Sequence, residues 1–557
     1  MKLNLRPWTC VLCIAALTLV AGCGDDGGAG ALVSLDAATD ASAPASDAGT
    51  LDPLEVQTTK GRVRGKLSLG SRAFLGIPYA TPPTGDKRWR APQPAAAWTE
   101  TLNAISYGPI CLQNTPDNSA FDATSSEDCL TLNVWAPETP ASEPLPVMVW
   151  LYGGAYLFGS GGPPYNGETL VREGKVVVVT LNYRMSELGF LAHPALSAEA
   201  RAANQPTSNF GLLDQRLALQ WVRDNIAAFG GDRENVTLFG ESAGANSVCL
   251  HMVAQGSRGL FHKAIVESGL CMKPLTTQAE AEAQGLRYAT QQGCTDPATV
   301  LSCLRERMPK ALLTYRIGPA SALPRGWLFY ADLSSFFAMS PVIDGVDLVE
   351  QPEQAFAAGR IARVPVLHGI NTSEGSLFHS GVLGDAPPVN AAEYQQLLHN
   401  RFGDKAAEVY AHQPDPTKLT DATTDALFVC PARRMATYLS SAGLPNFLYR
   451  FDLGVVSLFP ALNGIAFHSA ELPYVFGNDY LLGALPPANK PIASAMRGYW
   501  TQFAAHGDPN SSATVVPWPA FTSAAGGFLN LAATITPGSA WDPDCAAFWD
   551  GIPVVPL

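Results

Sequence analysis

A serine inside a short glycine-flanked sequence is the chain's clearest candidate for chemistry. Ser242 is the central residue of GESAG (residues 240–244), directly after the apolar run VTLF and before the helix-compatible segment ANSVCLHMVAQ. A serine on a sharp strand-to-helix turn presents its hydroxyl for attack on a carbonyl carbon, and the positive end of the helix favours developing negative charge. The pattern predicts Ser242 as a nucleophile, with a purely structural glycine turn as the alternative.

A second glycine-rich segment could supply hydrogen-bond donors to the same reaction. The sequence YGGAY (residues 152–156) follows an apolar run that ends at Leu151. Donors aimed at a developing oxyanion contribute about 3 kcal/mol each, and small residues let backbone N–H groups approach closely. The segment is similar to the HGGG-type loop, with Tyr for His and Ala for the last Gly. We expect the oxyanion donors to be the N–H groups of Gly154, Ala155 and Ala243, with an ordinary glycine turn as the alternative.

Glu374 is the predicted acid of a catalytic triad. It follows the apolar run VPVL (residues 364–367) closely, and open α/β sheets build their sites at the carboxyl ends of strands. In α/β hydrolases the acid and then the histidine follow the serine along the chain. Asp344 is the alternative acid, although Asp344-Gly345 is typical of a tight turn.

His468 is the predicted base. It lies in the loop FHSAELPYVFG, where its Nε2 atom would accept the proton of Ser242 while Glu374 orients the ring and stabilises the imidazolium. Four other histidines follow the acid in sequence. His379 is too close to Glu374 in sequence to meet it from another loop. His399 lies on a helix-like segment, His412 lies in a loop and His506 lies at a helix end.

The segments around these residues alternate between strands and helices. LPVMVWL (145–151) and KVVVVTL (175–181) are continuous apolar runs, which is typical of strands buried on both faces of a parallel sheet. Residues 211–229 carry apolar side chains at helical spacing before Gly230-Gly231. The pattern predicts an α/β fold with a mostly parallel sheet. Further short strands are expected at 236–239, 264–267 and 364–367, and an opening hairpin at 56–57 and 62–64.

The N-terminus has the pattern of an export signal. Lys2 and Arg6 precede an apolar run that is too short for a membrane span and ends in the lipobox-like sequence VAGC at Cys23. We expect residues 1–22 to be a lipoprotein-type signal peptide and Cys23 to be lipidated, with an ordinary signal cleaved nearby as the alternative. The protein would then be exported, and either secreted or anchored to the cell envelope through its lipid alone.

The rest of the chain divides into two parts. Residues 23–52 are mostly Gly, Ala, Asp, Ser and Thr and cannot bury enough apolar surface to fold, so we expect a flexible tether. Residues 53–557 form the expected catalytic domain, since 47% of the whole chain is hydrophobic and a large core is available. The net charge of −13 argues against a nucleic-acid partner.

Eleven cysteines are present, and their spacing leaves the connectivity open. Cys111 and Cys129 bracket one polar stretch, and Cys294 and Cys303 bracket a shorter one. Neither pair has CxxC or Cys/His spacing, so zinc is not expected. The predicted chemistry needs neither a metal nor an organic cofactor.

Taken together, the motifs resemble the type-B carboxylesterase/lipase family, which includes the cholinesterases. The resemblance runs from about Leu54 to the C-terminus and implies an α/β-hydrolase fold with a gorge over a triad of Ser242, Glu374 and His468. It also implies that Glu241 and Glu471 are carboxylates close to the histidine. The motifs that carry it are SEDCLTLNV (126–134), YGGAY, NYR (182–184), NFGLLDQ (209–215), GESAG, Glu374-Gly375 and His468 with Glu471.

The resemblance also implies three disulfides, Cys111–Cys129, Cys294–Cys303 and Cys430–Cys545. That would leave Cys249 and Cys271 buried and free.

Two departures from the family pattern affect the expected substrate and site. Cholinesterases place a tryptophan in the first disulfide loop to bind choline, but Phe121 is the only aromatic residue between 112 and 128, so a choline ester is not expected. Ser469 follows His468 where the family usually has glycine, a change not expected to remove function. Residues 327–339 and 455–465 would line the gorge with aromatic and apolar side chains.

The predicted activity is therefore hydrolysis of a small-molecule carboxylic ester with an apolar or aryl group, through an acyl-enzyme. A lipase or an amide or carbamate hydrolase on the same site is an alternative within the enzyme class. A non-catalytic, adhesion-type relative is the alternative outside it, and the filled triad positions argue against that reading.

Overall fold

The computed structural model describes residues 52–113, 124–313, 339–380, 387–479, 482–511 and 514–552. Asp52–Leu557 forms one compact unit. The expectations for the signal peptide, Cys23 and the tether concern residues outside the described ranges, as does most of the predicted gorge segment 327–339. No helix within these ranges is long and apolar enough to cross a bilayer.

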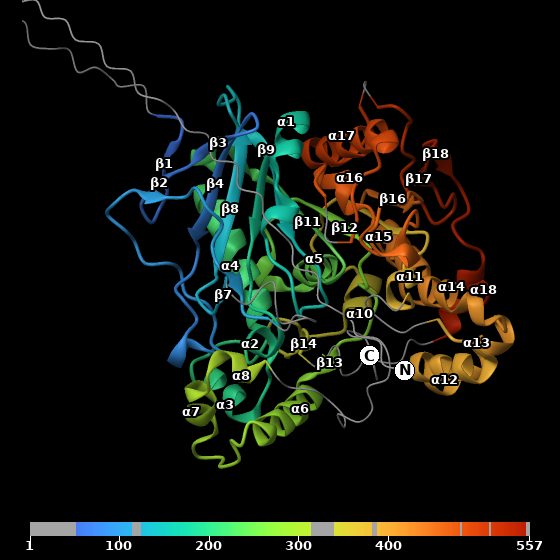
Figure 1. The fold of residues 1–557 in the computed structure, drawn as a ribbon, viewed down its shortest axis with the longest axis horizontal. Coiled ribbons are helices and arrows are strands. Elements are labelled where there is room, and N and C mark those ends of the chain that lie inside the picture. The colour runs from blue at the N-terminus through green and yellow to red at the C-terminus, as the bar shows by residue number, and fades with distance from the viewer. Residues whose placement is uncertain are drawn as a thin grey trace, which may run out of the picture. The chain divides into compact units, whose positions relative to one another are not determined.

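A large mixed sheet forms the centre of this unit (Figure 1). In spatial order the strands are β18 (Thr536–Gly538), β17 (Phe528–Leu531), β16 (Asn446–Phe451), β15 (Val366–Asn371), β12 (Lys263–Glu267), β11 (Gly231–Glu241), β9 (Leu145–Leu151), β10 (Val177–Leu181), β8 (Thr131–Pro137), β4 (Ser71–Pro78) and β3 (Lys66–Ser68). The strands from β10 through β9, β11, β12, β15 and β16 to β17 run parallel, and antiparallel strands extend both edges.

The central strands are apolar because helices cover both faces of the sheet. Every residue of β10 is buried, and β9 is buried from Val147 to Leu151. Parallel strands need crossover connections, which place helices on the two faces and exclude water from both. The predicted α/β fold and its mostly parallel sheet are confirmed.

Two neighbouring residues of β11 show which helices cover which face. The ring of Phe239 packs on Phe476 of α16 (Leu472–Phe476), whereas a Cβ on Gly240 would meet the backbone of Gly244 in α5 (Ala243–Val253). Successive side chains of a strand point to opposite faces, so α16 and α5 cover opposite faces of the sheet. The helices α1 (Glu168–Gly174) and α17 (Lys490–His506) pack with α16, and α4 (Phe210–Asn225) and α10 (Pro352–Ala357) pack with α5 (Figure 1).

The helices range from one turn to several. In chain order they are α1 (Glu168–Gly174), α2 (Ser186–Phe190), α3 (Pro194–Ala202), α4 (Phe210–Asn225), α5 (Ala243–Val253), α6 (Gln278–Gln291), α7 (Val300–Glu306), α8 (Pro309–Leu312), α10 (Pro352–Ala357), α11 (Gly375–Phe378), α12 (Ala391–Phe402), α13 (Ala406–His412), α14 (Leu419–Thr424), α15 (Cys430–Ser441), α16 (Leu472–Phe476), α17 (Lys490–His506) and α18 (Asp544–Ala547). The helix predicted over 211–229 is α4 followed by a 3₁₀ turn, and it stops at Gly230, whose φ of +93° suits glycine.

Short strands complete the fold. The predicted hairpin is present as β1 (Glu55–Gln57) and β2 (Arg62–Arg64), which pair antiparallel, and β5 (Leu102–Asn103) adds a third strand. Two further pairs are β6 (Ile110–Cys111) with β7 (Ser125–Ser126), and β13 (Thr276–Thr277) with β14 (Val342–Ile343).

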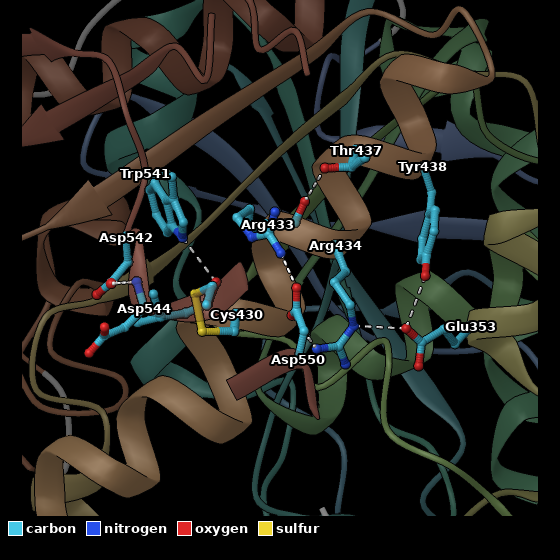
Figure 2. Close-up of polar contacts among 12 residues, drawn as sticks. Glu353, Cys430, Arg433, Arg434, Thr437, Tyr438, Trp541, Asp542, Asp544 and Asp550 are labelled. Atoms are coloured by element: carbon cyan, nitrogen blue, oxygen red, sulfur yellow. Dashed lines mark hydrogen bonds and ion pairs between the residues drawn. A yellow bond between two sulfur atoms is a disulfide. The ribbon is translucent and has the colours of Figure 1, made fainter. Parts of the chain in front are cut away.

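A disulfide and ion pairs connect residues 544–550, near the C-terminus, to α15 (Figure 2). The disulfide Cys430–Cys545 joins α15 to α18, and Arg434 of the same helix bridges Asp550 at 3.2 Å and Glu353 of α10 at 2.8 Å. Partly exposed ion pairs contribute little to stability, about 1 kcal/mol or less each. A disulfide that closes a loop of this length contributes roughly 5 kcal/mol, so it is the main constraint here.

The disulfides include one that the sequence analysis did not expect. The pairs Cys111–Cys129, Cys294–Cys303 and Cys430–Cys545 are present as the resemblance implied. The expectation that Cys249 and Cys271 are free is wrong, since they form a fourth disulfide. Helix α5 packs beside β12, which brings the two Cα atoms to 5.7 Å, a proximity that spacing along the chain does not reveal.

A non-reduced digest will distinguish the two states of this pair. Blocking free thiols before digestion should leave Cys249 and Cys271 unmodified and joined in one cross-linked peptide by mass spectrometry. The double variant Cys249→Ala/Cys271→Ala should lose about 3 kcal/mol of unfolding free energy, because the cross-link no longer constrains the unfolded chain. Alkylated Cys249 and Cys271 in the untreated protein would contradict the structure.

Candidate active site

Ser242 sits on a strained turn between a strand and a helix. Strand β11 ends at Glu241 and α5 begins at Ala243, and Ser242 between them has φ +54° and ψ −123°. A non-glycine residue in this region costs about 1–3 kcal/mol and persists only where its surroundings fix it. The N–H of Ser242 donates to the carbonyl of Glu267 at 3.0 Å, which ties the turn to β12. The partly exposed residue is therefore held in place by its backbone at the carboxyl edge of the sheet.

Glycines make this turn possible because backbones approach closely around it. A Cβ on Gly244 would lie 1.9 Å from the carbonyl oxygen of Leu151, and one on Gly240 would lie 2.6 Å from the backbone of Gly244. A Cβ on Gly153, in the neighbouring loop, would lie 2.9 Å from the Cβ of Ser242. The glycines of GESAG are therefore required by packing, and the YGGAY loop passes directly beside the serine.

The YGGAY loop has an unusual backbone. Gly154, Ala155 and Tyr156 have φ values of +102°, +56° and +64° in succession. In the described part of the chain the N–H groups of Gly154 and Ala155 donate to no protein oxygen. Ala243 is the first residue of α5, so its N–H has no partner within the helix. Within the described residues, all three predicted oxyanion donors are thus without a hydrogen-bond acceptor, and two of them lie in the loop that passes beside the serine.

His468 and Glu374 form a buried hydrogen-bonded pair. The Nδ1 atom of His468 donates to Oε2 of Glu374 at 2.6 Å, and the other carboxylate oxygen accepts from the N–H of Asn371 at 2.8 Å. Glu374 lies just beyond β15, at the start of α11, and a bridge between Ser373 and Phe467 brings the histidine loop to the same edge. Both oxygens of the buried acid are engaged, so the ring is fixed in orientation.

The other ring nitrogen of His468 faces Glu241. Its Nε2 atom lies 3.2 Å from Oε1 of Glu241, the residue before the serine. Within the described residues no hydrogen bond joins His468 to Ser242, and the ring contacts the residue that precedes the serine. Burial opposes the charged ring, but the attraction of Glu241 and then of Glu374 outweighs it, so the pKa of His468 lies above its usual value. Burial likewise raises the pKa of Glu241.

Two further buried glutamates surround this pair. Glu471 accepts from the Asn371 side chain, and burial and then Glu241 raise its pKa well above the usual range. Burial raises the pKa of Glu267 to about 8, although the indole N–H of Trp500 donates to it at 2.8 Å. Glu471 and Glu241 were expected near the histidine. Glu267 was expected only as the last residue of a strand. The one sequence feature that could have indicated a role at the site is its charge, which follows an otherwise apolar run.

Aromatic rings flank the histidine. The ring centroids of Phe378 and Phe428 lie 5.2 Å and 5.1 Å from that of His468. These two rings were not expected from sequence. The predicted gorge lining at 455–465 remains a prediction, and within it Leu458 is 94% exposed.

The alternative residues have other structural roles. Asp344 accepts N–H groups from the three residues Val346, Asp347 and Leu348, so it caps the tight turn. None of the other candidate histidines contacts Glu374 in the described part of the chain. His379 is hydrogen-bonded to Thr423, and His399 is exposed on α12. His412 pairs with Asp544, and His506 is the last residue of α17. The described part of the chain contains no group of three or more His, Cys, Asp or Glu side chains that could hold a metal ion.

Three features that lie at one edge of a parallel sheet define an α/β hydrolase. They are a serine on a strand-to-helix turn, backbone N–H groups that donate to no described protein oxygen, and a buried His–Glu pair. Residues 52–541 match the model of the carboxylesterase family. The chain is 38% identical over 485 residues to a para-nitrobenzyl esterase of Bacillus subtilis (strain 168), covering 84% of this chain and 92% of that protein. It is 35% identical over 495 residues to a fumonisin B1 esterase of Sphingopyxis macrogoltabida, covering 85% and 86%.

A solved structure of a PNB esterase superposes with a TM-score of 0.74 at 35% identity, covering 89% of this chain and 99% of that one. The chain therefore belongs to the carboxylesterase family, and it is a carboxylic-ester hydrolase.

Substitution of Gly244 should test the packing of the turn. Gly244→Ala forces a Cβ into the carbonyl of Leu151, so we expect a loss of at least about 3 kcal/mol in unfolding free energy, measured by urea denaturation. The matched control is Gly498→Ala, in the interior of α17, where nothing lies within 4 Å of the added Cβ. That change should be neutral or stabilise by up to about 1 kcal/mol. Equal stability of both variants would refute the close approach.

Proposed function

We propose that the chain hydrolyses carboxylic esters through an acyl-enzyme on Ser242, with His468 as the general base and Glu374 as the acid that orients it. The observation that carries the proposal is the 2.6 Å contact between His468 Nδ1 and Glu374 Oε2, buried beside a serine on a strained strand-to-helix turn. With the Nδ1 proton held by Glu374, the neutral ring presents the lone pair of Nε2 as the base.

The reaction would proceed in two acyl-transfer steps. Ser242 Oγ attacks the ester carbonyl as Nε2 of His468 takes its proton, and the oxyanion is held by the N–H groups of Gly154, Ala155 and Ala243. The C–O bond to the alcohol breaks, and the imidazolium returns the proton to the departing oxygen. Water then attacks the acyl-enzyme with the same proton transfers and releases the acid.

An apolar or aryl ester is the substrate class that the surroundings favour. Phe378 packs against His468 and is partly exposed, and flat apolar rings recognise apolar groups through buried area and ring contacts. One relative is named for a para-nitrobenzyl ester, whose alcohol is aromatic. No observation favours an amide, a carbamate or a long-chain lipid over such an ester.

The nucleophile is tested by Ser242→Ala. We expect kcat for p-nitrophenyl acetate to fall by at least about 10⁴-fold, because the acyl-enzyme cannot form. An organophosphate should add its phosphoryl mass to Ser242 in the wild-type protein and leave the variant unlabelled. The near-ultraviolet circular dichroism should match the wild type, since a small polar side chain on the surface of the turn is lost. Full activity of Ser242→Ala would overturn the assignment.

The substrate class is tested by a panel of esters. Benzyl and phenyl esters should give higher kcat/KM than acetylcholine or a long-chain triglyceride, because aromatic rings flank the base. Phe378→Leu, at the partly exposed ring beside His468, should lower the preference for benzyl over ethyl acetate by at least about threefold, and Phe503→Leu, a buried substitution in α17, serves as the control. An unchanged preference in Phe378→Leu would contradict the role of this ring.

A further inference from the structure

The residue after His468 has a backbone conformation that serine rarely adopts. Ser469 has φ +78°, in the left-handed region that favours glycine, and it is only 5% exposed. Such strain costs about 1–3 kcal/mol and points to a function when the residue is not glycine. Glycine at this position would avoid the strain, so a favourable contact of the serine side chain must offset it.

That contact joins the histidine loop to the nucleophile turn. The hydroxyl of Ser469 donates to Oε1 of Glu241 at 2.6 Å, across 228 residues of sequence. The same oxygen lies 3.2 Å from Nε2 of His468. On the other side, a Cβ on Gly153 would lie 2.5 Å from Oε2 of Glu241, so the carboxylate is confined between the two loops.

The geometry fixes where a proton must lie. Oε1 of Glu241 already accepts from Ser469, and a deprotonated Nε2 would face this oxygen lone pair to lone pair. A 3.2 Å contact between them is favourable only if one proton lies between Nε2 and the carboxylate. The pKa values of His468 and Glu241 are both raised, which agrees with a proton held by the pair. His468 must lose this proton before it can accept one from Ser242.

We propose that Ser469 is a positioning residue, whose hydroxyl donates to the Glu241 carboxylate, makes that carboxylate a weaker acceptor for the proton of His468 and lowers the pH at which His468 becomes free to act as a base. The inference rests on the proposed catalytic role of His468. It assigns a purpose to a serine side chain at a position whose backbone conformation favours glycine.

The direction of the effect follows from linkage. A hydroxyl that donates to Oε1 stabilises the carboxylate most when no proton is shared with His468, since a protonated ring competes for the same oxygen. The hydroxyl therefore favours release of the shared proton. Without it, the pair should hold its proton to higher pH, and the acidic limb of the activity profile should move upward.

The other groups near the pair remain in place in the variants proposed below. Glu374, which follows β15, contacts Nδ1, the opposite ring nitrogen of His468. Glu267, the last residue of β12, and Glu471, which directly precedes α16, interact with Glu241. The rings of Phe378 and Phe428 carry no charge. A shift in the profile on changing Ser469 alone therefore reports its contact with Glu241.

The test is kcat/KM against pH for Ser469→Gly and Ser469→Ala, with p-nitrophenyl acetate as the substrate. Both variants lack the hydroxyl, so both should move the acidic midpoint upward by about half a pH unit or more. They differ in strain, because glycine suits φ +78° and alanine does not. Ser469→Gly should therefore be the more thermally stable of the two while showing the same pH shift.

A double-variant cycle identifies the path of the effect. Glu241→Gln removes the charge that attracts the imidazolium and should lower the midpoint. In that background, Ser469→Gly should add less than about 0.2 pH unit, because the carboxylate through which the hydroxyl acts is gone.

Two results would overturn the inference: a wild-type midpoint in both Ser469 variants, or an undiminished shift in the Glu241→Gln background. These failures are separate from failure of the proposed function. His468→Gln that retains turnover would remove the catalytic role of the histidine. His468→Gln that is inactive, combined with unshifted Ser469 variants, would remove only the role of Ser469.

Discussion

The close approach of α5 to the end of β9 is the constraint on which the rest of the site depends. Gly244 lies so near the carbonyl of Leu151 that no side chain fits, and this contact sets the distance between the first turn of the helix and the YGGAY loop. Ser242 is bent into a strained conformation as a result, and the N–H of Ala243 belongs to the same turn. The position of the proposed nucleophile and of its proposed oxyanion donors is therefore a property of backbone packing.

The second determinant is the burial of negative charge. Glu241, Glu267, Glu374 and Glu471 are all buried, and a buried ionised carboxylate is costly unless it is hydrogen-bonded or paired. The structure satisfies them unequally. Both oxygens of Glu374 are engaged, whereas burial raises the pKa of Glu267 and Glu471. Glu374 is thereby held in place beside His468 by contacts to both of its oxygens, which suits the role proposed for it.

Much of the fold could be predicted because its local signals agree with one another. The runs that became β9 and β10 are apolar throughout, and only strands covered on both faces require that. GESAG could be placed at a turn because an apolar run precedes it and a helix-forming segment follows. The pairing of Cys249 with Cys271 could not be predicted, since it depends on α5 packing beside β12. Glu267 was missed for a similar reason, because its neighbours come from distant parts of the chain.

The sequence by itself determined the identity of the chemical groups, several of the central strands, and the membership of the chain in a family of ester hydrolases, because these follow from residue type and local periodicity. Only the tertiary structure decided which groups meet. The contact of His468 with Glu374 spans 94 residues, and that of Ser469 with Glu241 spans 228. Such contacts depend on how the loops at the carboxyl edge of the sheet come together, and that arrangement is set by packing across the whole domain.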